Sequence, residues 1–353
     1  MNILYLSCHA ILEYDEIKLF TEMGHNVFSM GAYQVNNSDN HLRPAIPGLY
    51  HNEHLVGSSL RCNKENLHPE IVEWCDVVIS MHNSRVQVED HPQPWIANNW
   101  EKFKKAGKPV IWRSIGQSTR EIEKSLQKFR KEGLKIVRYS PREESIPSYQ
   151  GSDALIRFYK DPTEYEGYTG NIPRIVNVSQ ALFGDGEVNS RGDHMSLDFF
   201  KQCTEGLDWK VFGPNNRNAG TDHNGGSLSF DDLKNMMKFN RVYFYTGTRP
   251  ASYTLALIEA MMTGIPIVSV GPLNGNQIYT DQKTFEAHEI IGESGVCGFW
   301  SDNVEEVRMI FERLINDQSW AQQIGQNGRG RAIELFGKET VRKEWEKLFD
   351  TLK

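Results

Sequence analysis

The chain has 353 residues, of which 39% are hydrophobic and 24% charged, a composition typical of a globular protein. Its net charge of −7 disfavours a general nucleic-acid binder, and its length predicts two domains of roughly 170 residues each. The five cysteines form no Cys-x-x-Cys pair, which argues against a zinc site or a disulfide framework. We expect a cytoplasmic protein without a signal peptide or a transmembrane helix, because no long apolar run occurs.

Short apolar runs alternate with helical segments along the first half of the chain. Buried parallel strands are expected at 2–7, 25–30, 76–81, 109–113, 134–139 and 154–159. Helices are expected at 14–23, 95–105 and 118–131. The last of these begins with a capping box formed by Ser118 and Glu121. Residues 31–70 show no clear period and are expected to form loops with short elements.

A polar stretch with glycine and proline at 160–173 is the predicted linker, and the alternation restarts after it. Further strands are expected at 174–178, 209–213, 242–245 and 265–270. Further helices are expected at 195–203, 230–238, 253–263, 304–316, 318–336 and 338–352. The order predicts two doubly wound α/β domains with parallel sheets, at 1–168 and 169–337. The C-terminal helix, 338–353, is expected to pack back on the first domain, and ligands should bind in a cleft beyond the carboxyl ends of the strands.

The most informative stretch runs from Tyr245 to Val270 and reads YTGTRPASYTLALIEAMMTGIPIVSV. It resembles the C-terminal motif of the retaining family 4 glycosyltransferases, in which a helix, a Gly-Pro turn and a strand follow at fixed spacing. The matching positions are Glu259, Ala260, Met261, Gly264, Pro266 and Val268. The resemblance implies the GT-B architecture, with an acceptor-side N-terminal domain and a C-terminal domain that binds the nucleotide sugar. It also implies transfer of a sugar from a nucleotide diphosphate to an acceptor hydroxyl.

The start of the motif helix is the predicted donor site. Ser252 and Thr254 can cap this helix, and the first amides, around Tyr253 and Leu255, are then available to a diphosphate. Such donors stabilise the charge that develops on a leaving nucleotide. Glu259 lies two turns further along, and the resemblance implies that it holds the ribose hydroxyls. The alternative is a structural carboxylate paired with an arginine or a backbone amide.

One position departs from the family pattern. Eight residues before Glu259 the family has a glutamate that contacts the donor sugar, and this chain has Ala251. Arg249 is nearby. We therefore expect either a sugar that lacks the corresponding hydroxyls or a site in which Arg249 holds them.

Two further donor-binding positions are predicted in the second domain. Arg191 is the only cation in the loop after the strand at 174–178, and it is either a phosphate ligand or a solvated arginine. Gly213 opens a turn that ends at Asn216, directly after a strand, and could approach the nucleotide base.

The first domain offers three candidate catalytic residues. Family members often end a strand with a histidine near the reacting sugar, and the PVIWRSIGQ segment lacks it. His82 and His9 each end another strand, and Arg113 ends this one, so all three are predicted to line the acceptor site. A structural role is the alternative for each.

Neither a metal nor a cofactor is expected. The chain has no Asp-x-Asp motif and no cluster with metal-ligand spacing, so the nucleotide sugar should act as a substrate without a catalytic metal. It also lacks the Gly-rich phosphate-binding motifs of P-loop and dinucleotide-binding proteins, which disfavours a kinase or a dehydrogenase.

Residues 102–142 are strongly basic, with 13 lysines and arginines but only 3 glutamates. Arg120, Lys124, Lys128 and Lys131 recur at helical spacing and share one face. This face is either solvated surface or a docking surface for an anionic acceptor: a phospholipid surface, a phosphorylated glycan or a nucleic acid. A peripheral membrane location is one form of the second alternative, and no obligate protein partner is indicated.

Two functions remain open. The first is a glycosyltransferase whose acceptor is a glycan, a lipid-linked sugar or a modified DNA base. The second is a GT-B-like protein that binds a nucleotide or a glycan without turnover, which the alanine at position 251 favours.

Overall fold

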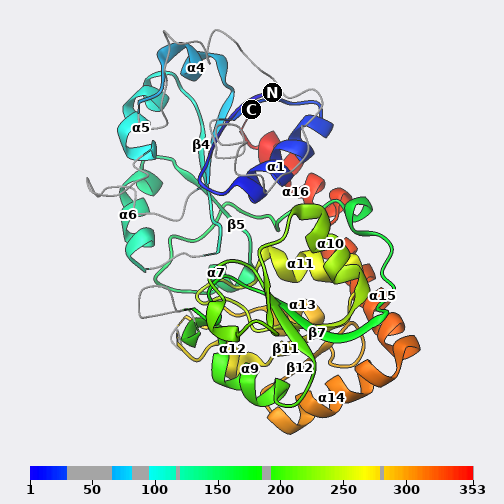
Figure 1. Cartoon of the computed structure of the whole chain (residues 1–353). Helices are drawn as coiled ribbons and strands as arrows, with labels where there is room; N and C mark the ends of the chain where they lie inside the picture. The colour runs from blue at the N-terminus through cyan, green and yellow to red at the C-terminus, as the bar shows by residue number, and fades with distance from the viewer. Residues whose placement is uncertain (30–65, 82–94, 117–119, 185–191, 279–281, 353) are drawn as a thin grey trace. The chain divides into compact units, whose positions relative to one another are not determined.

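The computed structural model describes residues 1–29, 66–81, 95–116, 120–184, 192–278 and 282–352 (Figure 1). These residues form two compact units. Unit 1 comprises Met1–Tyr159 and Lys338–Lys353, and unit 2 comprises Lys160–Gly337. The chain therefore passes between the units twice. The segment predicted as a linker, 160–173, begins unit 2 and contains the short helix η2 (Pro162–Tyr165).

Unit 1 contains a six-stranded sheet in the order β2-β1-β3-β4-β5-β6, in which all strand pairs are parallel. The strands are β1 (Asn2–Ser7), β2 (Asn26–Ser29), β3 (Val77–Met81), β4 (Val110–Arg113), β5 (Lys135–Arg138) and β6 (Ala154–Leu155). β3 and β4 are buried along their whole length, as helices on both faces of a parallel sheet require.

Helices cover both faces of this sheet (Figure 1). They are α1 (Ala10–Glu22), α4 (Pro69–Trp74), α5 (Trp95–Lys105), α6 (Arg120–Lys131), α7 (Pro141–Glu144) and α16 (Lys338–Asp350). On one face Trp100 of α5 meets Phe129 of α6 edge-on, with ring centroids 5.1 Å apart. On the other, Phe20 of α1 meets Trp345 of α16 at 4.9 Å. The C-terminal helix is thus part of the core of unit 1.

Unit 2 repeats the plan with the order β12-β11-β10-β7-β8-β9, again with all strand pairs parallel. The strands are β7 (Ile172–Val178), β8 (Trp209–Phe212), β9 (Asn224–Gly226), β10 (Asn240–Tyr245), β11 (Ile267–Val270) and β12 (Phe299–Ser301). β10 is buried throughout and occupies the middle of the sheet. The edge strands β9 and β12 have three residues each and were not predicted from the sequence.

The helices of unit 2 include η3 (Asp193–Met195), α9 (Leu197–Thr204), η4 (Arg217–Ala219), α10 (Phe230–Phe239), α11 (Leu255–Thr263), α12 (Pro272–Gly275), α13 (Ala287–Ile291), α14 (Val304–Asn316) and α15 (Gln318–Phe336). α11 packs against α10 and α15, whereas α14 packs against α9. α11 ends at Gly264, whose φ of +86° favours glycine. A Cβ on Gly325 of α15 would lie 1.9 Å from the Gly264 carbonyl oxygen, so the Gly-Pro turn of the motif allows close helix packing.

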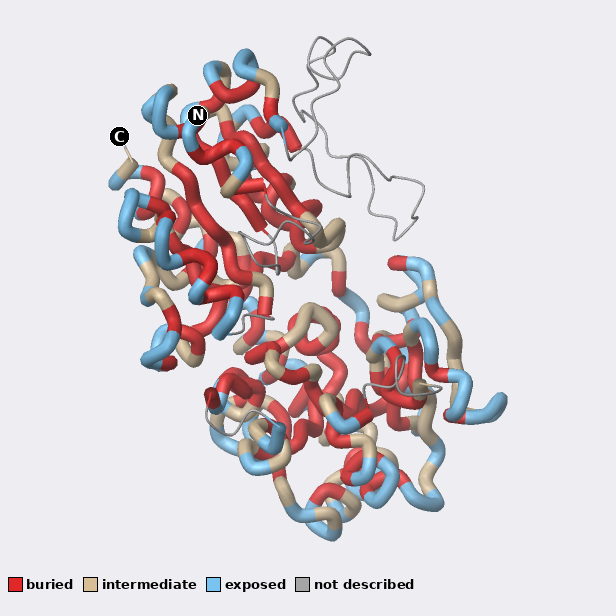
Figure 2. Tube along the Cα trace, turned by 90° about the vertical axis from the view of Figure 1, so that its left-hand side faces the viewer, coloured by how far each residue is buried: buried red, intermediate tan, exposed pale blue. Residues whose placement is uncertain are grey.

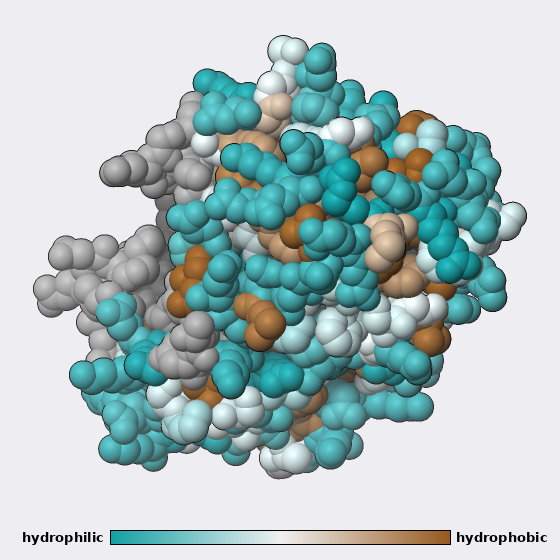
Figure 3. Space-filling view, turned by 90° about the horizontal axis from the view of Figure 1, so that it is seen from below, coloured by the Kyte–Doolittle hydropathy of each residue, from teal (hydrophilic) through white to brown (hydrophobic). Residues whose placement is uncertain are grey.

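Buried residues gather on the strands and on the inner helix faces of each unit (Figure 2). Hydrophilic side chains predominate on the face shown in Figure 3, where apolar side chains are scattered. None of the described helices is both long enough and apolar enough to cross a membrane.

The predicted elements agree with the structure where apolar periodicity is long. The helices predicted at 95–105, 304–316 and 318–336 have the predicted bounds. α1 begins at Ala10 rather than at residue 14, because His9 caps it. The proposed capping box at Ser118, and most of the segment 31–70, lie outside the described residues.

Charged groups are buried inside unit 1 and are paired there. Arg113 Nε donates to Glu16 Oε1 at 2.9 Å, and both side chains are at most 1% exposed. The Tyr5 hydroxyl donates to the other oxygen of Glu16 at 2.6 Å, and burial raises the pKa of Tyr5 well above its usual value. The Arg113 guanidinium also lies 5.7 Å from the ring centroid of Trp345. The Arg113 side chain thus contacts both α1, through its ion pair, and the C-terminal helix, through the Trp345 ring.

A second buried pair lies at the end of the neighbouring strand, β5. Arg138 donates to both oxygens of Glu123, at 2.6 and 2.8 Å. Glu143 lies nearby and accepts a 2.6 Å hydrogen bond from the Ser114 hydroxyl. Burial raises the pKa of Glu143 to about 7, against the lowering effects of Arg138 and of Ser114.

We predict that Glu16→Gln lowers the free energy of unfolding by about 3–5 kcal/mol, because it leaves the Arg113 charge buried without a counter-ion. Glu22→Gln is the matched control on the same helix. Glu22 pairs with Lys338 at 2.7 Å, but both side chains are about a third exposed, so the loss should stay within about 1 kcal/mol. Urea denaturation followed by tryptophan fluorescence measures both, and equal losses would contradict the prediction.

Candidate functional site

The loops at the carboxyl ends of the unit 2 strands hold the predicted donor-binding residues. In a doubly wound parallel sheet this edge is where ligands bind, because helices begin there and direct their amides outwards. The loops after β7, β8, β10 and β11 all lie at this edge.

The start of α11 presents backbone donors. Thr254 occupies the N-cap position with extended backbone, but its side chain makes no capping hydrogen bond. In the part of the chain that the structure describes, the amides of Leu255 and Ala256 have no acceptor, and both residues are half-buried. Together with the helix dipole, these donors form a suitable anion site.

The residues just before α11 are fixed by the core. The ring of Tyr253 packs on Phe336 with centroids 5.5 Å apart. The carbonyl of Ser252 accepts a hydrogen bond from the Glu286 amide at 2.9 Å. Four predicted donor-binding positions, Ser252 to Leu255, therefore lie together on one firmly held turn.

Glu259 is buried and has a lysine partner. Its Oε1 accepts from Lys160 Nζ at 2.7 Å and from the Tyr165 hydroxyl at 3.3 Å. Glu259 is 4% exposed and Lys160 0%, so the pair shields both charges from water. The Lys160 amide also donates to the carbonyl of Phe336 at 3.0 Å. Lys160 is the first residue of unit 2, and its role was not identified from the sequence; the ribose contact of Glu259 stays a prediction.

Arg249 is buried and joins the segment around His194 to the segment around Asn274 by hydrogen bonds. Its Nε donates to the Gly275 carbonyl at 2.9 Å, and its Nη1 to the carbonyls of His194 and Thr246. Its Nη2 donates to Ser196 Oγ at 2.8 Å and to the Asn274 carbonyl at 2.7 Å. A guanidinium has five N–H donors, and these contacts use all of them.

Burial lowers the pKa of Arg249 to about 10, while Tyr245 and Asp302 act in the opposite direction, so the group is cationic at neutral pH. The structure therefore places Arg249 beneath the site as a fixed positive charge. Direct contact of Arg249 with a donor sugar stays a prediction.

The loops after β7 and β8 approach each other closely at Gly213. Its φ is +117°, and a Cβ there would lie 2.4 Å from the Ser179 carbonyl oxygen. Asn216 fixes this contact: its Nδ2 donates to the carbonyls of Ser179 at 2.8 Å and Gly213 at 3.1 Å, and its Oδ1 accepts from the Phe183 amide. The turn at Gly213, which was predicted to approach the nucleotide base, is thus held against the loop after β7 by Asn216. This role of Asn216 was not predicted from the sequence.

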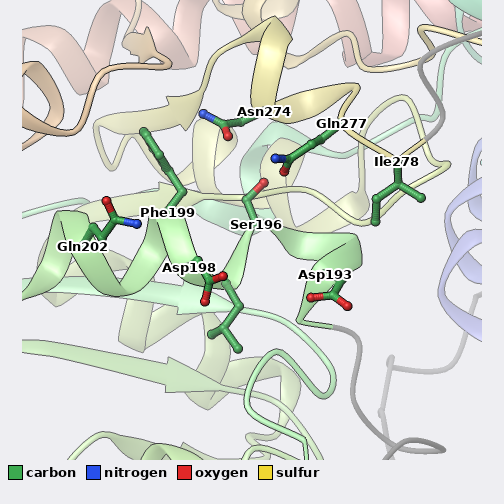
Figure 4. A pocket seen from close by; sticks show the side chains of 9 residues that line it. Asp193, Ser196, Asp198, Phe199, Gln202, Asn274, Gln277 and Ile278 are labelled. Carbon is green, nitrogen blue, oxygen red and sulfur yellow. The ribbon is translucent and has the colours of Figure 1, made fainter.

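A hollow of about 360 Å³ opens between the start of α9 and α12 (Figure 4). Its lining residues are Asp193, Ser196, Leu197, Asp198, Phe199, Gln202, Asn274, Gln277 and Ile278. Arg249 lies beside it, because Ser196 and Asn274 both accept its hydrogen bonds. The sequence pattern gave no signal for this hollow.

The remaining candidates are dispersed. Arg191 and His82 lie outside the described residues. His9 caps α1, since its Nδ1 accepts from the Leu12 amide at 3.4 Å. Arg113 is part of the buried ion pair in unit 1. Catalytic roles for His9, His82 and Arg113 stay predictions.

The basic region 102–142 divides into buried and surface charges. Arg113 and Arg138 are buried. Arg130 and Lys135 pair with Asp153 at the surface. On α6, Ile122, Leu126 and Phe129 face the core as predicted, while Lys124, Lys128 and Lys131 are exposed. Only part of the basic region is thus available to an acceptor.

Comparison with known proteins gives matches in structure alone. No known family model matches the chain, and no curated protein matches its sequence significantly. Among solved structures, Anabaena Alr3699/HepE in complex with UDP is 15% identical at a TM-score of 0.66, with 99% of this chain and 100% of that chain covered. The same protein in complex with UDP-glucose is 16% identical at 0.65, with the same coverage.

Sucrose-phosphate synthase from Thermosynechococcus elongatus is 13% identical at a TM-score of 0.66, with 100% of this chain and 99% of that chain covered. These likenesses, together with the two six-stranded parallel sheets, show the two-domain Rossmann-like fold of the GT-B glycosyltransferases. Membership of family 4 stays a prediction.

We predict that Gly213→Ala destabilises the protein by about 1–3 kcal/mol, because the positive φ and the close Ser179 carbonyl both oppose a side chain. Gly206→Ala is the control. Its φ is +74°, but nothing lies within 4 Å of the added Cβ, so it introduces backbone strain without a clash. Thermal unfolding of both variants tests this. If Gly213→Ala lowers the stability no more than Gly206→Ala does, the close approach of Gly213 to Ser179 has no energetic importance.

Proposed function

We propose that this protein is a retaining glycosyltransferase that moves a sugar from a nucleotide-diphosphate donor to an acceptor hydroxyl. The observation that carries the proposal is the start of α11, where amides without acceptors stand about one turn before the buried carboxylate of Glu259. The GT-B fold, and structural neighbours solved with UDP and UDP-glucose, support it.

The proposed chemistry needs an anion site more than an acid or a base. The acceptor oxygen bonds to the anomeric carbon of the sugar while the bond from that carbon to the diphosphate oxygen breaks. The hydroxyl proton passes to the departing diphosphate. The amides of Leu255 and Ala256 would stabilise the charge that builds on this leaving group, which is where preorganised donors are most effective. Retention is implied by the family resemblance.

Glu259 would accept hydrogen bonds from the ribose hydroxyls, and Lys160 would keep this carboxylate ionised inside the protein. A carboxylate buried without a cation is costly and tends to take up a proton instead. The 2.7 Å contact with Lys160 supplies that cation and fixes one carboxylate oxygen in place. Lys160 is accordingly a positioning residue in this proposal.

The acceptor is proposed only by class: a glycan, a lipid-linked sugar or a modified DNA base. The exposed lysines of α6 would suit an anionic one. The second candidate function, binding without turnover, is favoured by Ala251, which stands where the family pattern has a sugar-contacting carboxylate. Release of free nucleotide from a donor in the presence of candidate acceptors distinguishes the two.

We expect Glu259→Gln to weaken nucleotide binding roughly ten- to a hundredfold, since hydrogen bonds to a charged group contribute about 1.5–3 kcal/mol. Calorimetric titration with UDP, ADP and GDP, each beside its 2′-deoxy analogue, gives the measurement. The preference for the ribose form should shrink in the variant. Glu259→Gln alone leaves the Lys160 charge buried without its partner and could unfold the protein. The double variant Lys160→Met with Glu259→Gln removes both charges, so it tests the same role without this cost.

Glu166→Gln is the control for these titrations, because Glu166 is 70% exposed and lies 3.6 Å from Arg329. It should bind nucleotide like the wild type. Equal affinity and equal ribose preference in Glu259→Gln would remove the ribose role and, with it, the proposed function.

We predict that turnover persists in excess EDTA. The reason is that the α11 amides and the helix dipole supply the electrostatic stabilisation that a divalent ion would otherwise provide. Product formation is measured with and without chelator. Loss of turnover that manganese or magnesium restores would show that the reaction depends on a metal.

A further inference from the structure

The hollow between α9 and α12 is lined by polar side chains, and those of Asp193, Asp198, Gln202 and Gln277 are exposed to solvent. The side chains of Asp193, Asp198, Gln202, Asn274 and Gln277 make no hydrogen bond to any described residue. Five such groups around one volume of about 360 Å³ provide acceptors and donors from two loops. This volume is within the range of small-ligand sites.

The side chains of the lining disfavour a phosphate. Two carboxylates contribute, and none of the nine lining residues is a lysine, an arginine or a histidine. Arg249 lies beside the hollow, but its N–H groups are all directed to protein acceptors. The two carboxylates therefore offset the charge of Arg249 and the dipole at the start of α9, whereas the α11 amides would attract an anion. The hollow thus favours an uncharged ligand more than the start of α11 does.

The walls are held in place without a ligand. Arg249 joins them, because its Nη2 donates both to Ser196 on the α9 side and to the Asn274 carbonyl on the α12 side. Ser196 is 6% exposed, and its hydroxyl, which accepts this hydrogen bond, still has a proton to donate. Figure 4 shows the Ser196 side chain directed towards Asn274 and Gln277. A site fixed in this way loses little entropy when it binds.

We propose that the hollow binds one uncharged glycosyl unit. Sugar hydroxyls both donate and accept, so they suit carboxylates, amides and a buried serine hydroxyl. Ile278, which is 38% exposed, and the small accessible part of Phe199 supply apolar surface for the C–H groups of a sugar ring. The assignment rests on the proposed function, because that function supplies the two sugars that could bind here. They are the sugar of the donor and a sugar of the acceptor.

The assignment also explains how the departure at Ala251 is tolerated. Arg249, two residues earlier, donates its backbone amide to the His194 carbonyl at 3.0 Å, next to Asp193 of the lining. The motif loop after β10 is therefore attached to the segment that carries the carboxylates. Asp193 and Asp198 would supply the carboxylate contacts that position 251 lacks.

The test uses Asp198→Asn combined with Asn274→Ala in the full chain. Both side chains lack hydrogen bonds to the described residues, and the main-chain contacts of Asn274 are retained, so the fold should persist. Gln323→Ala, an exposed change on α15, is the control. The probes are glucose, glucuronate and glucosamine, which differ in charge, and UDP beside UDP-glucose. Calorimetry and saturation-transfer NMR measure binding.

In the wild type and the control we expect glucose to bind better than glucuronate, or UDP-glucose to bind better than UDP. In the double variant that preference should fall about tenfold, the effect of losing roughly one good hydrogen bond. Loss of the UDP-glucose advantage identifies the donor sugar as occupant; loss of glucose binding alone identifies an acceptor glycan.

Three results would overturn the assignment: binding unchanged by the double variant, tightest binding of glucosamine, or an equal loss of UDP affinity. Failure of the proposed function is distinct, because a wild type that binds no nucleotide could still bind glucose at the hollow.

Discussion

Burial of charge is the constraint on which both units depend. A carboxylate inside a protein needs a cation at contact distance, or it is neutralised by a proton. Lys160 meets this need for Glu259 in unit 2, and Arg113 meets it for Glu16 in unit 1. Each pair joins segments distant in sequence: the first joins the start of unit 2 to α11, and the second joins β4 to α1. The pairs therefore specify how helices dock on the sheets, beyond what apolar contact alone would fix.

The same constraint changes how charged residues in the sequence are interpreted. Arg113 ends β4, and Arg249 lies in the loop after β10, so both are at the edge of a sheet where a cation often meets a ligand. In the structure both are buried and bind protein groups: Arg113 binds a carboxylate, and Arg249 binds a row of carbonyls and Ser196. Arginine suits this use because its planar, permanently charged group can hold several acceptors at once. Such arginines fix the loops and helices that surround a site without contacting its ligand.

The fold could be predicted because its signals are local. The apolar run of β3 and the long periodicities of α14 and α15 each specify an element within a few turns of chain. The motif also located α11 within two residues of its start. Lys160 and Asn216 could not be identified in this way, because their partners lie 99 and 37 residues away. The three-residue strands β9 and β12 escape prediction because neighbours, rather than propensity, make them strands.

The edge of unit 2 combines two environments of opposite character, and their separation has a physical basis. Helix dipoles and unpaired amides create a positive potential only within about one turn of a helix start, as at α11. The hollow lies at the start of α9 and beside the Arg249 cation, but Asp193 and Asp198 add two carboxylates to its lining. A ligand with a charged diphosphate at one end and a neutral sugar at the other has different preferences at its two ends. The carboxylates of the hollow and the free amides of α11 would therefore favour one orientation of such a ligand.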